Sequence, residues 1–245
     1  MKKILIIGAC SAIAQETAKL FAKDGHQLFL ADINNTGLEI VKKELLLMGE
    51  TEIFTSFFDV TEFSKHSQLI ENAISSLNGL DLLFIAHGTL PNQEEVQKDA
   101  SRAIKEFEIN AMSVISLCTI AANYFEEKKD GAIAVISSVA GDRGRQSNYL
   151  YGSAKGAVSL FLQGLRNRLS KSNVHILTIK PGLVDSPMTA HLPKNFLFAK
   201  PSDIAKGIYK AIEGRKDIVY LPSYWWLILT TLKLIPESIF KKMNL

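Results

Sequence analysis

Strand-like apolar runs alternate with helical stretches along this chain, and that alternation restricts the fold more than any other feature of the sequence. The expected strands are residues 3–7, 27–31, 52–58, 81–86, 132–137, 174–179 and 218–220. The expected helices are residues 11–23, 35–48, 62–77, 98–128, 151–169 and 202–214, the last with Ser202 as its N-cap. Strands that are apolar on both faces and alternate with helices are typical of a parallel sheet covered on both sides. We therefore predict an α/β fold, a single doubly wound domain whose parallel sheet has about seven strands joined by right-handed crossovers.

The size and composition of the chain fit one globular domain. Its 245 residues lie within the range of single α/β domains, and no internal repeat, low-complexity segment or linker divides them. A net charge of +3 gives no reason to expect a nucleic-acid partner. The two cysteines, Cys10 and Cys118, form no CxxC pair, which suits a reducing compartment and indicates no zinc site. We expect a cytoplasmic protein without a bound metal.

The N-terminus has two interpretations. Lys2 and Lys3 precede an apolar run, and residues 12–14 resemble a cleavage site, as in a secretory signal peptide. The uninterrupted apolar run, residues 4–7, is short for the apolar region of such a peptide. A helical pattern and a second strand-like run follow it. We therefore favour a buried strand that enters a turn of small residues and then a helix.

The turn after the first expected strand has the character of a phosphate-binding turn. It contains Gly8, Ser11, Ala12 and Ile13. A glycine-rich turn between a strand and a helix lets backbone N–H groups approach a pyrophosphate at the helix N-terminus. Only Gly8 is a glycine here, so a packing turn without a ligand is an alternative that this motif alone leaves open.

Carboxylates follow the next two expected strands. Asp32 ends the second strand, where a carboxylate can accept hydrogen bonds from the ribose hydroxyls of a dinucleotide and repel a 2′-phosphate. Asp59, followed by Val60, comes after the third strand and could hold an adenine amino group. Each aspartate also has a structural alternative: Asp32 as a turn residue or helix cap, and Asp59 as the cap of the helix beginning near residue 62.

Tyr151, Lys155 and Ser138 form the most informative group. Tyr151 and Lys155 are four residues apart in an expected helix, so their side chains lie on one face about a turn apart. A nearby ammonium lowers the pKa of a tyrosine, which makes the phenol useful as a proton donor and acceptor near neutral pH. Ser138 follows a strand end, where open α/β sheets place their ligands.

With these residues in this order, the sequence resembles the classical short-chain dehydrogenase/reductase (SDR) family over nearly its whole length. The matching motifs are Gly8-x-x-x-Ala12-Ile13-Ala14, Asp59-Val60, Asn110, Ile136-Ser137-Ser138-Val139-Ala140-Gly141, Tyr151-Gly152-Ser153-Ala154-Lys155 and Pro181-Gly182. The resemblance implies a Rossmann domain in which residues 1–217 bind a dinucleotide and carry the catalytic groups, and residues 218–245 are an apolar extension of the same domain. It also implies a homodimer or homotetramer, and NAD or NADP as the cofactor that supplies the hydride chemistry.

The resemblance further implies roles for individual residues. Tyr151 would be the general acid/base, and Lys155 would bind the nicotinamide ribose and lower the pKa of Tyr151. Ser138 would orient the substrate oxygen, and Asn110 would hold a water in a proton relay. The residues implied to contact the cofactor are Gly8, Ser11, Ala12, Ile13, Asp32, Asp59, Val60, Ala86, His87, Gly88, Tyr151, Lys155, Pro181, Gly182, Val184 and Thr189.

The sequence departs from the family pattern at two places. Ala12 and Ala14 replace the second and third glycines of the turn, and their methyl groups are tolerable where the backbone is not at positive φ. Residues 85–88, Ile-Ala-His-Gly, stand where the family usually has Asn-Asn-Ala-Gly. His87 either reaches the cofactor or is structural. Neither departure touches the catalytic residues, so we expect an active enzyme.

The C-terminal stretch is the most apolar part of the chain. Trp225 and Trp226 are adjacent, and Pro222 and Pro236 limit a helix there to about 13 residues, too short to span a bilayer comfortably. Paired tryptophans with a flanking tyrosine and nearby lysines are typical of an interfacial anchor. A helix that covers the active site or packs in a dimer is an equal alternative. With the apolar loop 188–198, either interpretation indicates a hydrophobic or lipid-linked substrate.

These observations together predict an oxidoreductase that transfers a hydride between NAD(H) and a ketone or secondary alcohol on a small, apolar molecule. Asp32, and the lack of a basic residue in the turn 9–13, favour NAD over NADP. The alternatives are an NADP(H)-dependent carbonyl reductase and a non-catalytic dinucleotide-binding protein with the same fold. If the C-terminal stretch is an anchor, the protein also contacts the membrane surface.

Overall fold

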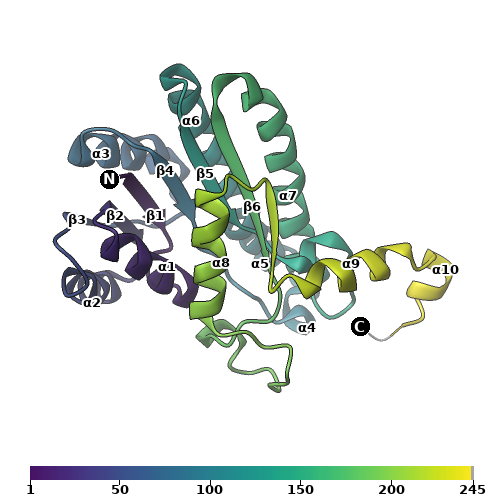
Figure 1. The fold of residues 1–245 in the computed structure, drawn as a ribbon. Helices are drawn as coiled ribbons and strands as arrows, with labels where there is room; N and C mark the ends of the chain where they lie inside the picture. Colours follow the sequence, from purple (N-terminus) through teal and green to yellow (C-terminus); the bar gives the residue numbers. More distant parts are fainter. Residues whose placement is uncertain (244–245) are drawn as a thin grey trace.

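Seven parallel strands form the centre of the molecule in a computed structural model that describes residues 1–243 (Figure 1). The strands are β1 (Lys3–Ile7), β2 (Gln27–Asp32), β3 (Ile53–Phe57), β4 (Leu82–Ile85), β5 (Gly131–Ile136), β6 (Val174–Pro181) and β7 (Ile218–Leu221). Their order is β3-β2-β1-β4-β5-β6-β7, and every neighbouring pair is parallel. This order confirms the doubly wound sheet, and its direction reverses between β1 and β4, where sheets of this kind bind ligands.

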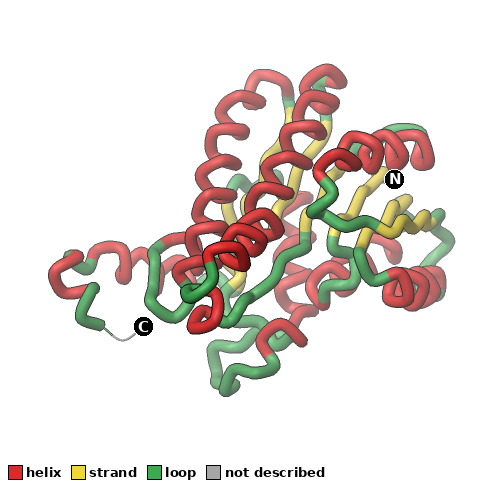
Figure 2. The backbone as a smooth tube through the Cα atoms, turned by 180° about the vertical axis from the view of Figure 1, so that it is seen from behind, coloured by secondary structure: helices red, strands yellow, loops and turns green. Residues whose placement is uncertain are grey.

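Helices cover both faces of the sheet (Figure 2). On one face lie α1 (Ala12–Lys23), α2 (Asn35–Leu46) and α8 (Pro201–Glu213); on the other lie α3 (His66–Leu77), α6 (Ser113–Lys128) and α7 (Tyr149–Leu169). Successive side chains of a strand point to opposite faces. Accordingly, Leu5 and Ile7 belong to one core and Ile4 and Ile6 to the other, all fully buried. This double burial explains why the strands are apolar throughout.

The structure confirms the long helical stretch expected at 98–128 and corrects one helix cap. Helical structure runs without a break from residue 100 to 128, as α5 (Ala100–Phe107), a π-helical turn (Glu108–Met112) and α6, and the short α4 (Gln93–Val96) precedes it. A π-helical turn holds an extra residue, which is common at functional sites, and this one contains the buried Asn110. Ser202 does not cap α8, because the helix begins at Pro201, whose fixed φ suits the first helical position.

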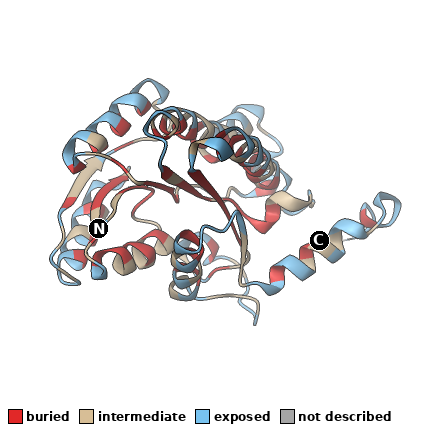
Figure 3. Ribbon diagram, turned by 45° about the horizontal axis from the view of Figure 1, so that its top comes forward, coloured by how far each residue is buried: buried red, intermediate tan, exposed pale blue. Residues whose placement is uncertain are grey.

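The chain ends in two helices that extend away from the body of the molecule (Figures 1 and 3). They are α9 (Tyr224–Leu234) and α10 (Glu237–Phe240). One face of α9 contacts the body, since Trp225 and Leu229 are buried against Val139. Much of the remainder of the extension is exposed in Figure 3. Within residues 1–243, no helix is long and apolar enough to cross a membrane.

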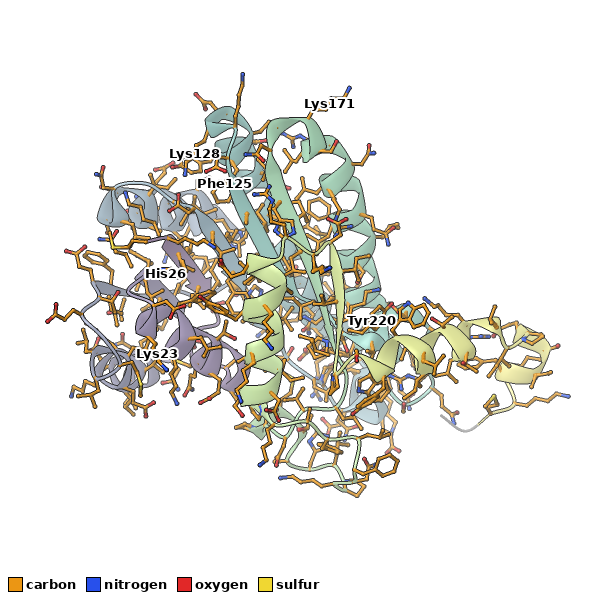
Figure 4. The ribbon with its side chains drawn as sticks, in the orientation of Figure 1. Lys23, His26, Phe125, Lys128, Lys171 and Tyr220 are labelled. Atoms are coloured by element: carbon orange, nitrogen blue, oxygen red, sulfur yellow. The ribbon has the colours of Figure 1, made fainter. Side chains whose placement is uncertain are left out.

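Charged groups fasten this extension to the loop that follows β5. The buried carboxylate of Asp142 pairs with Lys180 on β6 and accepts a hydrogen bond from the Tyr220 hydroxyl at 2.6 Å. Figure 4 shows Tyr220 where β7 leads into α9. The guanidinium of Arg143 donates to the carbonyl oxygen of Ile235 at 2.8 Å. These bonds hold residues 139–143 in place, next to the expected catalytic serine.

Candidate active site

A cavity of about 720 Å³ lies at the carboxyl ends of β1, β2, β4, β5 and β6. Of the residues expected at the site, those lining it are Gly8, Ser11, Ala12, Ile13, Asp32, Asp59, Val60, Ala86, His87, Gly88, Ser138, Tyr151, Lys155, Pro181, Gly182, Val184 and Thr189. Asn110 alone among the expected residues does not line it. The tertiary structure thus brings residues from the whole length of the catalytic part into one site.

The first turn has the geometry that a bound pyrophosphate requires. Gly8 has φ +81°, and a Cβ there would lie 2.4 Å from the backbone nitrogen of His87. Only glycine fits this position without strain. Ser11 caps α1 by accepting a hydrogen bond from the Ala14 N–H at 3.3 Å. Ala12 and Ala14 lie in the first turn of α1 and not at positive φ, so their methyl groups impose no backbone strain.

Asp32 and Asp59 each accept hydrogen bonds that stabilise a turn, and both line the cavity. Asp32 accepts hydrogen bonds from the N–H groups of Cys10 and Asn34, both at 2.9 Å. Burial and the Asp32 carboxylate raise the pKa of the Cys10 thiol to about 12, so this cysteine is not a nucleophile at neutral pH. Asp59 accepts from the N–H and hydroxyl of Thr61 at 2.8 and 2.7 Å, which lowers its pKa. It does not cap the helical turn that begins at residue 63, so the capping alternative is wrong.

Ser138 and Tyr151 face the cavity from β5 and α7. Ser138 Oγ accepts a hydrogen bond from the Ala140 N–H at 3.1 Å. We expected Lys155 to lower the pKa of Tyr151, but the net shift is upward. Burial raises this pKa to about 12, and hydrogen bonding with Ser138 opposes the rise. The removal of the phenolate from water is therefore the larger effect, and the phenol carries its proton at neutral pH.

Lys155 is a buried cation at the floor of the site. Its side chain donates to the carbonyl oxygen of Ile136 at 3.1 Å, and its Nζ lies 5.7 Å from the centroid of the Tyr151 ring. Only 2% of the residue is exposed. Burial lowers its pKa from the ordinary 10.5 to about 8, so the ammonium is poised to lose its proton just above neutral pH.

This lowered pKa predicts a pH-dependent stability difference between the wild type and Lys155→Met. Between about pH 8 and 10.5 the unfolded chain binds the Lys155 proton more tightly than the folded chain, so this group adds stability as the pH rises. We expect the difference in unfolding midpoint, wild type minus variant, to increase with pH over this range. Thermal unfolding of both proteins at pH 7 to 10 measures the difference, and a constant difference would contradict the prediction.

Asn110 and His87 pack around the loop that follows β4. The Asn110 amide donates to Thr89 Oγ1 at 2.8 Å and accepts from the Thr89 N–H at 3.0 Å. A Cβ at Gly88 would lie 2.9 Å from Asn110 Oδ1 and 3.3 Å from Lys155 Nζ, so this loop passes between those two side chains. The water-holding role of Asn110 stays a prediction.

His87 is both a structural residue and part of the cavity wall. Its Nε2 lies 2.8 Å from Ser113 Oγ, and burial together with the charge of Lys155 lowers its pKa to about 3. The ring is therefore neutral at physiological pH. The bond to Ser113 is local compensation for the asparagine hydrogen bonds that the segment 85–88 lacks.

The cavity is also lined by residues outside the expected set, among them the polar Arg145 and Asn148, and by Trp225 of α9. A Cβ at Gly182 would lie 1.8 Å from the indole Nε1 of Trp225, so the ring rests directly on that glycine. The available signal for Arg145 and Asn148 was their position between Ser138 and Tyr151, because a loop joining two site residues must pass near the site. A helix that covers the active site was one of the interpretations of the Trp225–Trp226 stretch, and Trp225 does line the cavity.

Comparison with known proteins agrees with this geometry. A sequence model described as short chain dehydrogenase matches residues 2–196. The chain belongs to the SDR family. This SDR is 28% identical over 240 residues to an uncharacterized oxidoreductase of Mycobacterium tuberculosis, covering 98% of this chain and 96% of that protein. It is 30% identical over 225 residues to a hydroxysteroid 11-beta-dehydrogenase 1-like protein of Xenopus tropicalis, covering 90% and 78%.

The fold of this SDR is also that of solved relatives. A short-chain dehydrogenase from Sphingobium yanoikuyae in complex with NADPH matches with a TM-score of 0.83 at 20% identity, over 99% of this chain and 96% of that one. The protein is therefore an oxidoreductase whose cofactor is NAD or NADP. The positive φ of Gly8, the N-terminus of α1 and the carboxylate of Asp32 fit a dinucleotide at the switch point of the sheet.

Proposed function

We propose that this SDR transfers a hydride between NAD(H) and a ketone or secondary alcohol on a hydrophobic or lipid-linked small molecule. The observation that carries the proposal is that Ser138, Tyr151 and Lys155 line one cavity with the glycine turn at Gly8. A non-catalytic dinucleotide-binding protein would have no use for this proton-transfer group. Turnover of any carbonyl compound excludes that alternative, and cofactor binding without turnover would support it.

The roles follow from the chemistry of each side chain. In the reduction direction Tyr151 Oη gives its proton to the substrate oxygen as that oxygen gains negative charge. The Ser138 hydroxyl donates a hydrogen bond to the same oxygen and orients the carbonyl. Lys155 holds the nicotinamide ribose and places its positive charge beside Tyr151, and Asn110 holds a water that returns the proton. The bound nicotinamide supplies or accepts the hydride.

The proposed preference for NAD rests on Asp32. Its carboxylate lines the cavity at the end of β2, and residues 9–13 contain no Lys or Arg that could pair with a 2′-phosphate. Because like charges placed together cost several kcal/mol, we expect NADH to bind at least about tenfold more tightly than NADPH. The Asp32→Ala variant should narrow this gap. Fluorescence titration with both cofactors measures it, and tighter NADPH binding by the wild type would establish the alternative, an NADP(H)-dependent carbonyl reductase.

The apolar wall beyond the catalytic residues supports a hydrophobic substrate. Leu90, Met188, Leu192 and Trp225 line the cavity, and burial of apolar area would favour a ligand of matching character. A panel of ketones of increasing chain length, assayed with NADH, tests this part of the proposal. A preference for short, polar ketones would overturn it.

The two faces of the C-terminal helix α9 differ: one covers part of the cavity, and the other is apolar and exposed. Trp225, on the inner face, covers part of the cavity, while Trp226, Leu227 and Leu234 are 57%, 63% and 79% exposed on the outer face. We propose that the outer face contacts a membrane surface, with the exposed lysines of residues 241–242 beside anionic lipid. Co-sedimentation with lipid vesicles tests this contact. Light scattering tests the alternative of a homodimer or homotetramer formed through this face.

A further inference from the structure

The cavity contains an arginine with no counter-ion. Arg145 lines it, and its Nε is buried without a hydrogen-bond partner. Within residues 1–243, no carboxylate pairs with it, although Arg102, Arg143, Arg166 and Arg168 each have an acidic partner. Burial lowers the pKa of Arg145, and no neighbouring acid opposes that effect. Arg145 is thus a partly desolvated cation whose charge the protein does not balance.

An unbalanced cation at such a position is a cost to the folded protein. Removing charge from water without a partner is unfavourable, and cavities that carry such groups are sites where a ligand supplies the missing partner. Arg145 lies in the loop between Ser138 and Tyr151, and all three residues line one cavity. The guanidinium is a fork of donors that matches a carboxylate or a phosphate.

A second residue that lines the cavity also has an unpaired donor, although this nitrogen lies against Gly182 and is not open to the cavity. Trp225 comes from α9 and is only 7% exposed, and its indole Nε1 has no hydrogen-bond partner among the residues that the structure describes. An indole N–H can only donate. Two buried donors, Arg145 and Trp225, therefore lack acceptors, and the remaining lining of the cavity is largely apolar.

We propose that the substrate of this SDR carries an anionic group, a carboxylate or a phosphate, which Arg145 binds inside the cavity. This inference rests on the proposed function, since it assigns the ligand of the same site. The remaining apolar lining binds the rest of the molecule, so the ligand is amphipathic: an apolar body with one anionic group near the reacting carbon.

The experiment measures binding rather than turnover. Decyl phosphate, decanoate and decanol share one apolar chain and differ in the terminal group, and each is titrated into the full-length protein by calorimetry. We expect at least one of the two anions to bind at least tenfold more tightly than decanol. The phosphate and carboxylate arms identify which anion the site prefers. Equal binding of all three compounds would overturn the proposal.

Variants test whether Arg145 is the residue that causes the preference for the anion. Arg145→Gln should abolish the preference for the anion, and Arg145→Lys should retain part of it because the charge remains. Arg102→Gln, which removes an exposed arginine outside the cavity, should leave the preference unchanged. Survival of the preference in Arg145→Gln would overturn the proposal.

Measurements of stability and turnover distinguish this inference from a structural role for Arg145 and from the proposed function. The buried Nε of Arg145 has no hydrogen-bond partner among the described residues, so Arg145→Gln should not lower the unfolding midpoint. A fall of several degrees would assign Arg145 a structural role and overturn the proposal. Tyr151→Phe should bind the anion as the wild type does. A preference for the anion without turnover of any ketone would overturn the proposed function alone. Turnover of a ketone without a preference for the anion would overturn this inference alone.

Discussion

Replacing Tyr151 with phenylalanine should reduce turnover roughly 10²- to 10⁴-fold while NADH still binds. The variant removes only the phenolic oxygen, and the ring that packs in the buried site remains. Burial holds the pKa of this phenol at about 12, so the group carries its proton at neutral pH and can donate it to a ketone oxygen. Steady-state oxidation of NADH with a ketone, together with fluorescence titration of NADH, checks both halves of the prediction.

Tyr149 provides a matched control in the same helix. It lies two residues before Tyr151 in the first turn of α7 and is 46% exposed. Tyr149→Phe therefore removes the same atom from the same helical turn without altering the cavity, and we expect turnover within about twofold of the wild type. If both variants lose activity equally, or if Tyr151→Phe keeps more than a tenth of it, Tyr151 is not the proton donor.

Replacing Asp142 with alanine should destabilise the fold by about 3–5 kcal/mol, which lowers the unfolding midpoint of a chain of this size by roughly 6–20 °C. The side chains of Asp142 and Lys180 are 3% and 8% exposed. The variant leaves the Lys180 ammonium buried without a counter-ion and the Tyr220 hydroxyl without its acceptor. Because Asp142 also fastens the loop after Ser138 to the C-terminal extension, turnover should fall as well. Thermal unfolding by circular dichroism measures the stability change.

Glu237→Gln is the control for the loss of a negative charge in this region. Glu237 pairs with Arg143, but its side chain is 77% exposed, and exposed pairs contribute 1 kcal/mol or less. We expect a change of at most about 3 °C. The double variant Asp142→Leu with Lys180→Met should recover most of the stability, because it removes both buried charges. A midpoint for Asp142→Ala within about 2 °C of the wild type would show that the buried pair contributes little.

Local signals in the sequence account for most of the fold and for the core of the site. The strand at residues 3–7 and the four-residue spacing of Tyr151 and Lys155 depend on neighbours in the chain, and the structure has both. The expected direction of the Tyr151 pKa shift was wrong. Spacing shows that an ammonium is near, but it does not show how many apolar atoms exclude water from the phenol.

The sequence by itself determined the alternation that yields a parallel sheet, the requirement for glycine at the first turn, and the order of the catalytic residues, because each depends on backbone conformation or on spacing within one element. Only the tertiary structure decided which charges have partners. Asp142 contacts Lys180 and Tyr220, which are 38 and 78 residues away in the chain. Within residues 1–243, Arg145 has no acidic partner. Only the tertiary structure likewise brings Trp225, from a helix outside the catalytic part, onto Gly182. Whether a buried polar group has a hydrogen-bond or ionic partner depends on the residues that the fold places around it. This distinguishes a structural ion pair from an unpaired charge that can bind a ligand.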